Sequence, residues 1–225
     1  MKKILYIGLF STLLAVSCGK DKDTPPDPNG GSYMNAKAGS TWNYEVINNQ
    51  PPVSTSNYTL TSTNRDSSVN GKTYHVYINS SNGRSEYYHV AGSDHFTFGS
   101  LPAAVGANFN VENLYLKSDA APGATWSQPY TITLPGFPLP LSVTVTHKIE
   151  EKGLTKVVNS VTYNNVIHIT TTLSGPGITP SILTTNINIF YAPNHGLIES
   201  NNIITSSLIG NSNSTTRLKT ATLIP

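Results

Sequence analysis

Cysteine is almost absent from the 225-residue chain, in which Cys18 is the only one. No disulfide can form within the chain, so sheet pairing and core burial must hold the fold. Charged side chains are also scarce, at 12%, and no stretch keeps the apolar spacing of an amphipathic helix. The apolar run from Ile4 to Val16 is too short for a membrane-spanning helix, which needs about 20 residues.

Recognised catalytic motifs are missing as well. The sequence has no Gly-x-Ser-x-Gly elbow, no His-Glu-x-x-His pair and no glycine-rich phosphate loop. Enzymatic activity and a cofactor are therefore not predicted. A hydrolase whose site is assembled across strands stays an alternative, because sequence spacing does not show such a site.

The N-terminal residues follow the order of a secretory signal, with Lys2 and Lys3 before the apolar run and Ser17 before Cys18. The segment Leu14-Ala15-Val16-Ser17-Cys18 resembles the lipobox of bacterial lipoproteins. The resemblance implies that residues 1–17 are a signal peptide and that the Cys18 sulfur carries a diacylglyceryl group. The alternative is an ordinary secretory signal cleaved nearby.

Residues 18–32 are rich in proline, glycine and charge and predict a flexible tether behind the lipidated cysteine. Lys20, Asp21 and Asp23 resemble the export signal of Bacteroidota-type surface lipoproteins. We therefore expect a protein anchored by lipid to the bacterial outer membrane and exposed at the cell surface. Loss of the signal removes two of the 14 basic residues and leaves 12 basic and 12 acidic. This balance does not favour nucleic acid as a partner.

The remaining residues, 33–225, predict one all-β domain, because β-branched and aromatic residues alternate between Gly, Pro and Asn clusters. Val143 and Val145, for example, share one strand face, opposite Thr144 and Thr146. Half-polar strands of this kind are typical of an antiparallel β-sandwich or a curled, half-open barrel. The clearest strands span residues 41–47, 58–63, 73–78, 86–90, 142–149, 166–173, 182–190 and 197–205.

An internal repeat divides this domain. The turn and strand start at residues 39–44, which contain Trp42, recur at residues 123–130, which contain Trp126. Residues 69–74 likewise match residues 158–163. We predict two similar halves, approximately 33–119 and 120–225, which close onto each other as one body, since each half alone would bury little apolar surface.

The same motifs, in the same order, carry a resemblance to a family. They are Gly39–Tyr44, Asn70–Tyr74, Gly123–Trp126, Tyr163–Ile167 and Tyr191–Glu199. The chain resembles a group of uncharacterised Bacteroidota-type surface lipoproteins, and the resemblance spans nearly the whole mature domain. These motifs are structural: a Trp and a Tyr two residues apart enter the core from one strand face. The resemblance implies no activity or site.

Titratable residues give weak candidates for a site. His75, His89 and His95 could hold a metal only if adjacent strands brought them together, and their spacing matches no ligand pattern, so no metal is predicted. Glu150 and Glu151 lie between two lysines and are predicted to form a solvated hairpin end rather than an acid–base pair.

Binding residues are a better prediction. Aromatic rings with Asn and Ser neighbours suit sugar recognition, although half of them are expected in the core; they are Tyr74, Tyr77, Tyr87, Tyr88, Phe96, Phe98, Tyr115 and Tyr130. The apolar loop 134–141 either folds over one end of the barrel or forms a contact patch through Phe137, Leu139 and Leu141.

The predicted function is a non-catalytic binding module for a glycan or a protein at the cell surface. The first alternative is an envelope carrier of lipid or lipoprotein, which needs an apolar groove. Further alternatives are the hydrolase described above and a purely structural role.

Overall fold

The computed structural model of the chain describes residues 32–99, 111–132, 140–207 and 210–225. Every regular element in these ranges is a β-strand, as predicted, and none of their segments is a helix long and apolar enough to cross a membrane. The strands are β1 (Thr41–Asn48), β2 (Ser54–Val69), β3 (Lys72–Asn79), β4 (Ser85–Ala91), β5 (Asp94–Phe98), β6 (Glu112–Lys117), β7 (Thr125–Ile132), β8 (Leu141–Val158), β9 (Val161–Ser174), β10 (Leu183–Ala192), β11 (Gly196–Ser206) and β12 (Ser212–Thr222).

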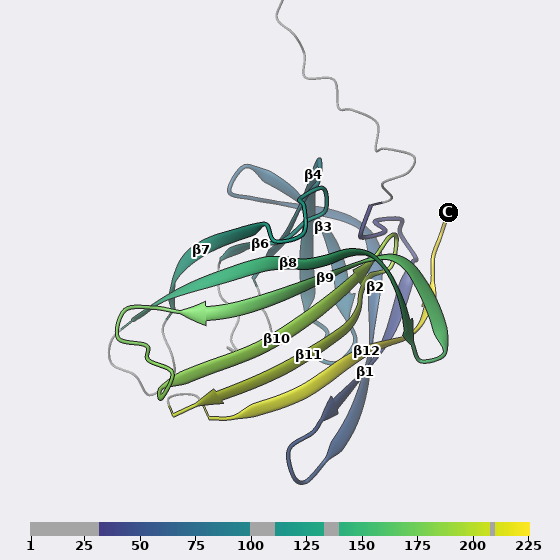
Figure 1. Cartoon of the computed structure of the whole chain (residues 1–225). Helices are drawn as coiled ribbons and strands as arrows, with labels where there is room; N and C mark the ends of the chain where they lie inside the picture. Colours follow the sequence, from purple (N-terminus) through teal and green to yellow (C-terminus); the bar gives the residue numbers. More distant parts are fainter. Residues whose placement is uncertain (1–31, 100–110, 133–139, 208–209) are drawn as a thin grey trace, which may run out of the picture.

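All twelve strands belong to one antiparallel sheet, in the order β6-β5-β4-β3-β2-β1-β12-β11-β10-β9-β8-β7. Only the pairing of β1 with β12 joins strands that are not consecutive in sequence. The sheet curls until its ends approach each other, with β7–β12 as one curved layer and β1–β6 behind it (Figure 1). The prediction of a curled, half-open barrel is therefore confirmed.

The first six strands are connected to the last six between β6, which ends at Lys117, and β7, which begins at Thr125. The hairpin turn between β2 and β3 has positive φ at Asn70 (51°) and Gly71 (79°). Two-residue hairpin turns of this type favour Asn and Gly, which tolerate that conformation. The turn between β8 and β9 repeats it with positive φ at residues 159 and 160. A duplication of the sequence itself stays a prediction.

The core lies between the two layers. Trp42 is fully buried and Tyr44 nearly so, on the same face of β1, as the sequence pattern predicts. Around them the first hydrophobic cluster joins both halves, since it includes Leu60 and Tyr77 from one and Ile198 from the other. The second cluster is rich in isoleucine; its buried members are Tyr33, Tyr115, Leu116, Ile149, Ile167, Ile169, Ile187, Ile189, Tyr191 and Ile204.

Side chains, not a strand ladder, join the two edge strands β6 and β7. Trp126 Nε1 donates a hydrogen bond of 2.7 Å to the carbonyl of Leu114, and the Tyr130 hydroxyl donates one of 2.9 Å to the carbonyl of Glu112. The amide of Leu114 donates to Gln128 Oε1 at 2.7 Å. The three β7 side chains come from every second residue of the strand and therefore point to the same side. They form hydrogen bonds with backbone groups of β6 that would otherwise be unpaired at the edge of the sheet.

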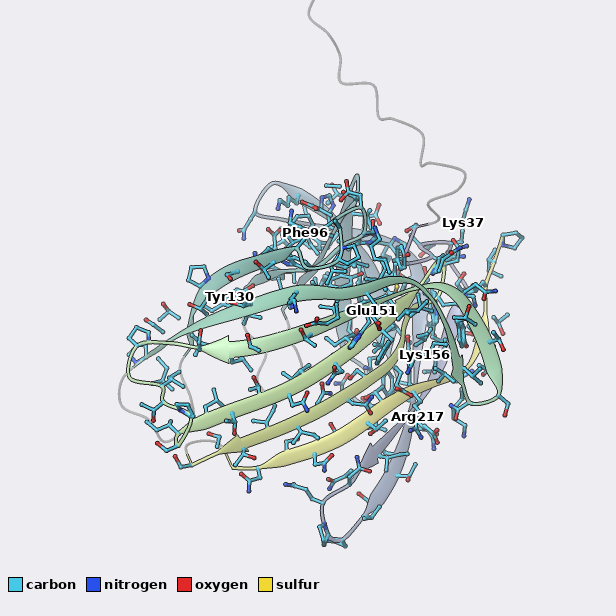
Figure 2. All side chains as sticks on the ribbon, viewed as in Figure 1. Lys37, Phe96, Tyr130, Glu151, Lys156 and Arg217 are labelled. Atoms are coloured by element: carbon cyan, nitrogen blue, oxygen red, sulfur yellow. The ribbon has the colours of Figure 1, made fainter. Side chains whose placement is uncertain are left out.

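The outer side of the β7–β12 layer carries ion pairs. Glu199 accepts from Lys156 Nζ and from Arg217 Nε, each at 3.1 Å. Figure 2 shows Lys156, Arg217 and the more exposed Glu151 on the side of this layer that faces away from β1–β6. The polar and charged groups on this side keep the outer face wetted, while the opposite face forms the core.

Candidate ligand-binding cavity

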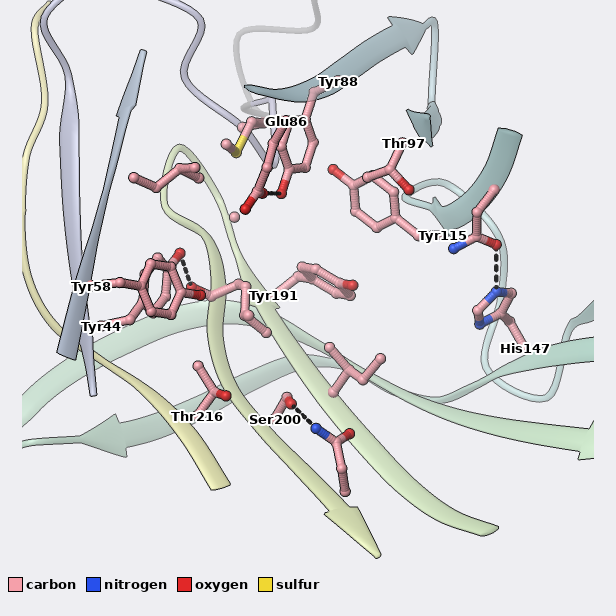
Figure 3. A pocket seen from close by; sticks show the side chains of 17 residues that line it. Tyr44, Tyr58, Glu86, Tyr88, Thr97, Tyr115, His147, Tyr191, Ser200 and Thr216 are labelled. Carbon is pink, nitrogen blue, oxygen red and sulfur yellow. Dashed lines mark hydrogen bonds between the residues drawn. The ribbon is translucent and has the colours of Figure 1, made fainter. Parts of the chain in front are cut away.

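A cavity of about 260 Å³ lies between the two halves of the barrel. Its lining comes from β1, β2, β4, β5 and β6 on one side and from β8, β10, β11 and β12 on the other. Figure 3 shows the side chains that line it. Glu86 and Tyr58 each keep part of their surface exposed, so the cavity can be reached from solvent. Five lining residues are tyrosines: Tyr44, Tyr58, Tyr88, Tyr115 and Tyr191.

Tyr44 and Tyr58 form one wall of the cavity. They lie directly opposite each other on β1 and β2, and their rings stack with centroids 5.0 Å apart at 24°. The Tyr44 hydroxyl donates a hydrogen bond of 2.9 Å to the carbonyl of Leu197 on β11, across the barrel. This bond fixes the stacked pair, so the wall is a rigid aromatic surface.

Tyr88, Tyr115 and Tyr191 form a second aromatic group. The ring of Tyr115 contacts Tyr88 edge-on at 6.1 Å and Tyr191 at 5.3 Å. Tyr115 lies on β6 and Tyr191 on β10, so this contact also bridges the halves. Aromatic pairs with such geometry stabilise by about 0.5–1.5 kcal/mol beyond the area they bury.

All five tyrosine hydroxyls of the cavity remain protonated. Burial raises the pKa of each of them above its ordinary value. The nearby carboxylate of Glu86 raises the pKa of Tyr44, Tyr58 and Tyr88 further. The hydroxyls are therefore neutral; those of Tyr44 and Tyr88 donate their protons within the protein and offer a ligand only acceptor lone pairs.

Glu86 supplies the only carboxylate among the lining residues in the described part of the chain. One of its oxygens accepts from Asn79 Nδ2 at 2.7 Å and the other from the Tyr88 hydroxyl at 3.0 Å. Glu86 and Tyr88 are two residues apart on β4 and point to the same side, as Figure 3 shows. The two bonds hold the carboxylate against the cavity.

Asn202 on β11 presents an unsatisfied acceptor. Its side chain lines the cavity, and the residue is only 6% exposed. Its Nδ2 donates to Ser200 Oγ at 3.0 Å, but its Oδ1 is buried and has no partner among the described residues. A buried acceptor without a partner costs about 1–3 kcal/mol, and a ligand hydroxyl that reaches it through a small shift of the Asn202 side chain regains part of that amount.

His147 and Asn113 close the side of the cavity next to the β6–β7 edges. His147 Nδ1 lies 2.8 Å from Thr171 Oγ1, and its Nε2 lies 3.2 Å from Asn113 Oδ1. Since an amide oxygen only accepts, Nε2 carries the proton and Thr171 donates to Nδ1. Burial lowers the pKa of His147 to about 4, so the ring is neutral at pH 7. The Tyr130 hydroxyl also reaches Asn113 Oδ1, at 3.3 Å.

The charge of the cavity limits what it can bind. No lysine or arginine lines it in the ranges that the structure describes, and its histidine is neutral. Glu86 therefore leaves it with a negative charge. Phosphates and carboxylates, which need cationic or multiple backbone donors, are disfavoured, whereas neutral or cationic ligands are compatible.

A Ser–His–Asp array lies elsewhere, on β2 and β3. Ser62 Oγ is 2.9 Å from His75 Nε2, and His75 Nδ1 is 2.9 Å from Asp66 Oδ1. These distances match a nucleophilic triad, but the exposure is reversed: Ser62 is 1% exposed and the Asp66 side chain 61%. In this structure no substrate carbonyl can reach Ser62 Oγ. The array fixes the irregular pairing of β2 with β3 between Ser62 and Asp66.

The three histidines considered for a metal do not converge. His75 belongs to that array, His89 Nδ1 bonds the carbonyl of Thr73 at 2.8 Å, and His95 is buried beside Tyr115. Across the described residues, no group of three His, Cys, Asp or Glu side chains is placed to hold a metal ion.

The acidic pair Glu150–Glu151 is not at a hairpin end, and that prediction is wrong. β8 continues to Val158, and both residues lie within it. Glu150 binds Lys148 Nζ and Thr170 Oγ1, at 2.7 and 2.6 Å. The sequence pattern underestimates the length of β8, because the regular alternation of side chains is interrupted where the pairing with β9 is irregular.

The other predicted site residues have different outcomes. Cys18, Phe137 and Leu139 lie outside the described residues, so their roles stay predictions. Leu141 is the first residue of β8 and packs, partly buried, against the small cluster around Tyr130.

The aromatic residues named from the sequence separate into three groups. Tyr88 and Tyr115 line the cavity. Tyr74, Tyr77 and Tyr130 are buried. The remaining three are partly exposed: Tyr87, Phe96 and Phe98. Sequence analysis missed Glu86 and Asn202, whose local sequences contain no binding motif.

Fold and cavity together define a nearly closed twelve-stranded barrel with an interior, tyrosine-lined space. No protein-family model matches the chain, and neither does any curated protein. A candidate lipoprotein from Parabacteroides distasonis has a similar solved structure, with a TM-score of 0.52 and 14% sequence identity over 85% of this chain and 99% of that chain. At this identity the likeness shows a shared fold alone.

A second solved structure is a candidate exported protein with a YmcC-like fold from Bacteroides fragilis. It matches with a TM-score of 0.44 and 10% identity, over 85% of this chain and 99% of that chain. Both solved neighbours thus come from Bacteroidota and are described as a lipoprotein or an exported protein.

Proposed function

We propose that the chain is a lipid-anchored protein of the bacterial outer membrane that binds a saccharide in the cavity between its halves. The observation that carries the proposal is the combination of five tyrosines with the unpartnered Oδ1 of Asn202 in one cavity. The described residues bring these groups together from both halves of the barrel.

The chemistry of the lining suits a sugar. A sugar ring has apolar C–H faces that pack on aromatic rings and hydroxyl edges that need hydrogen-bond partners. The stacked pair Tyr44–Tyr58 supplies a flat aromatic surface. Ser200, Asn202 and Thr216 supply hydroxyl and amide groups to the same lining. A few placed polar groups in an aromatic wall are what orient a small ligand.

The volume sets the size of the ligand. Sites for drug-sized molecules measure about 300–1,000 Å³. At about 260 Å³ the cavity is just below this range, so it suits a ligand of one or two sugar rings. A longer glycan would place only its end in the cavity.

The carrier alternative fits the lining less well. An acyl chain packed beside Glu86 would take that carboxylate out of water and give it no partner. Burial of an unpaired charge is costly, and carriers of acyl chains avoid it with apolar walls. Met34, Leu60 and Ile189 give the cavity some apolar surface, but polar groups interrupt it.

Replacement of Asn202 by leucine is expected to weaken saccharide binding about tenfold or more while leaving stability nearly unchanged. Leucine has a similar size; it loses the bond from Nδ2 to Ser200 Oγ but also removes an acceptor that has no partner in the free protein, so the two effects on folding largely cancel. Binding loses a hydrogen bond, and about 1.4 kcal/mol corresponds to tenfold in Kd. Calorimetric titration with a panel of mono- and disaccharides, together with urea unfolding, measures both quantities.

Asn201→Leu is the matched control. Asn201 lies next in the chain on the opposite strand face, where it bonds Glu199 and Thr215. This change should leave saccharide affinity unaltered. If no saccharide in the panel binds the wild-type protein, or if both variants lose affinity equally, the proposal is wrong.

The anchor is tested separately. Cells that express the full chain should incorporate radiolabelled palmitate into it, and Cys18→Ser should abolish the label, because the thiol is the acceptor of the lipid. Retention of the label in the variant would contradict lipidation at Cys18. Ser17→Ala, which keeps the cysteine, is the control and should remain labelled.

A further inference from the structure

The cavity contains one charge that the protein does not neutralise. The ion pairs of the described residues involve Glu112, Asp66, Asp94, Glu150, Glu199 and Glu151 as their acidic partners. Glu86 is not among them, and its two hydrogen bonds come from neutral donors. A ligand that fills the cavity strips water from this carboxylate, and a neutral hydroxyl compensates that loss less well than a charged donor does.

The surroundings of Glu86 favour a cation in particular. Three tyrosines, Tyr44, Tyr58 and Tyr88, lie close enough for the charge of Glu86 to raise the pKa of their hydroxyls. Aromatic rings attract cations through the negative potential of their faces. A carboxylate among tyrosine rings is therefore suited to an ammonium group, which can donate to the carboxylate and contact the rings.

We infer that the cavity selects a ligand bearing an ammonium group, with Glu86 as its ion-pair partner and Asn202 Oδ1 as a second acceptor at the opposite wall. Resting on the proposed saccharide function, this identifies the preferred ligand as an amino sugar with a free amine. The amine bonds Glu86, and a ring hydroxyl donates to Asn202. Acetylation of the amine removes the charge and so removes the preference.

The test is a calorimetric comparison of three probes on the full-length protein without its signal: glucosamine, glucose and N-acetylglucosamine. Glucosamine should bind about 10- to 100-fold more tightly than the other two, as expected for one charged hydrogen bond. Glu86→Gln keeps the size of the side chain and can still accept from Asn79, so the variant should fold. It should reduce the preference for glucosamine over glucose and N-acetylglucosamine to near unity.

Glu151→Gln is the matched control, because the Glu151 side chain is 60% exposed and lies outside the cavity. It should keep the full preference. Equal affinities of the wild-type protein for glucose and glucosamine, or an unaltered preference in Glu86→Gln, would overturn the inference while leaving saccharide binding intact. Binding of choline with no binding of any sugar would instead overturn the saccharide function and retain the ammonium site.

Discussion

Acidification from pH 7 to pH 4 is expected to lower the free energy of unfolding by about 3 kcal/mol for each of two buried histidines. Burial lowers the pKa of both His95 and His147 to about 4, from an ordinary value near 6.5. One pKa unit corresponds to about 1.4 kcal/mol. The two shifts together make on the order of 6 kcal/mol of the free energy of unfolding dependent on pH, which is a large share of the total for a domain of this size.

The hydrogen bonds of His95 explain why it resists protonation. Ser118 donates its hydroxyl proton to the carbonyl of Ser93 at 3.1 Å, so its oxygen accepts from His95 Nε2 at 3.3 Å. Nε2 thus carries the proton, and Nδ1 is a bare lone pair, buried without a partner among the described residues. The Tyr33 and Tyr115 rings pack around the imidazole. A proton on Nδ1 would find no acceptor.

The direction of the effect follows from proton binding. Between pH 6.5 and 4 the histidines bind protons in the unfolded chain and stay neutral in the folded one. The unfolded state then holds more protons, so stability falls as the pH falls through this window. Above pH 6.5 both states are neutral, and the histidines contribute no further dependence on pH.

Urea unfolding at pH 7, 5.5 and 4 measures this loss. The control is the double variant His95→Phe, His147→Gln, in which phenylalanine replaces a ring with an unsatisfied nitrogen and glutamine keeps polar contacts. Carboxylates and the remaining histidines titrate alike in both proteins, so the difference between the two pH profiles isolates the buried pair. Parallel profiles would show that these histidines do not resist protonation.

Sequence patterns predicted the regular strands better than the irregular ones. The eight predicted strands correspond to β1–β4 and β8–β11. Most of their bounds agree within a few residues, but β2 and β8 extend well beyond the predicted ranges. β5 and β6 are short, β7 contains a proline and several polar residues, and β12 is dominated by Ser, Thr and Asn, so none shows a clear apolar face. Pairing with β1 and β11 makes β12 a strand despite this composition, which is a tertiary effect.

The cavity could not be predicted from the sequence, because its residues become neighbours only through the curl of the sheet. Glu86 and Asn202 come from different halves, 116 positions apart. Nothing in the local sequence distinguishes Asn202 from Asn201, which faces outward; only the side of the strand differs. The abundance of tyrosine was the one usable signal for the lining, and it did not show where the tyrosines meet.

The two tryptophans show why a repeated motif need not have a repeated role. Trp42 and Trp126 open the first strand of each half, β1 and β7. β1 is central in the sheet, and Trp42 is fully buried. β7 is an edge strand, and the partly exposed Trp126 covers the edge of β6 through its bond to Leu114. Position in the sheet decides which role the motif takes.

Replacement of Trp42 by alanine is therefore expected to cost about 3–5 kcal/mol of unfolding free energy, the usual range for a buried tryptophan. Its ring packs against Tyr77 at 5.8 Å and joins residues of both halves in the first hydrophobic cluster. The truncation leaves a cavity. Because β1 is paired with a strand on each side, the sheet cannot move inward to fill it. Urea unfolding followed by far-ultraviolet circular dichroism measures the loss.

Two further variants separate packing from hydrogen bonding. Trp126→Ala should cost clearly less than Trp42→Ala, since its side chain is only partly buried and one hydrogen bond contributes about 1 kcal/mol. Trp42→Phe should recover most of the loss, because it refills much of the space and removes the indole Nε1, a buried donor without a partner among the described residues. Equal losses for the two alanine variants would show that Trp42 does not join the halves. A Trp42→Phe variant as unstable as Trp42→Ala would show that Nε1 has a partner, such as a buried water, whose bond outweighs the packing of the ring.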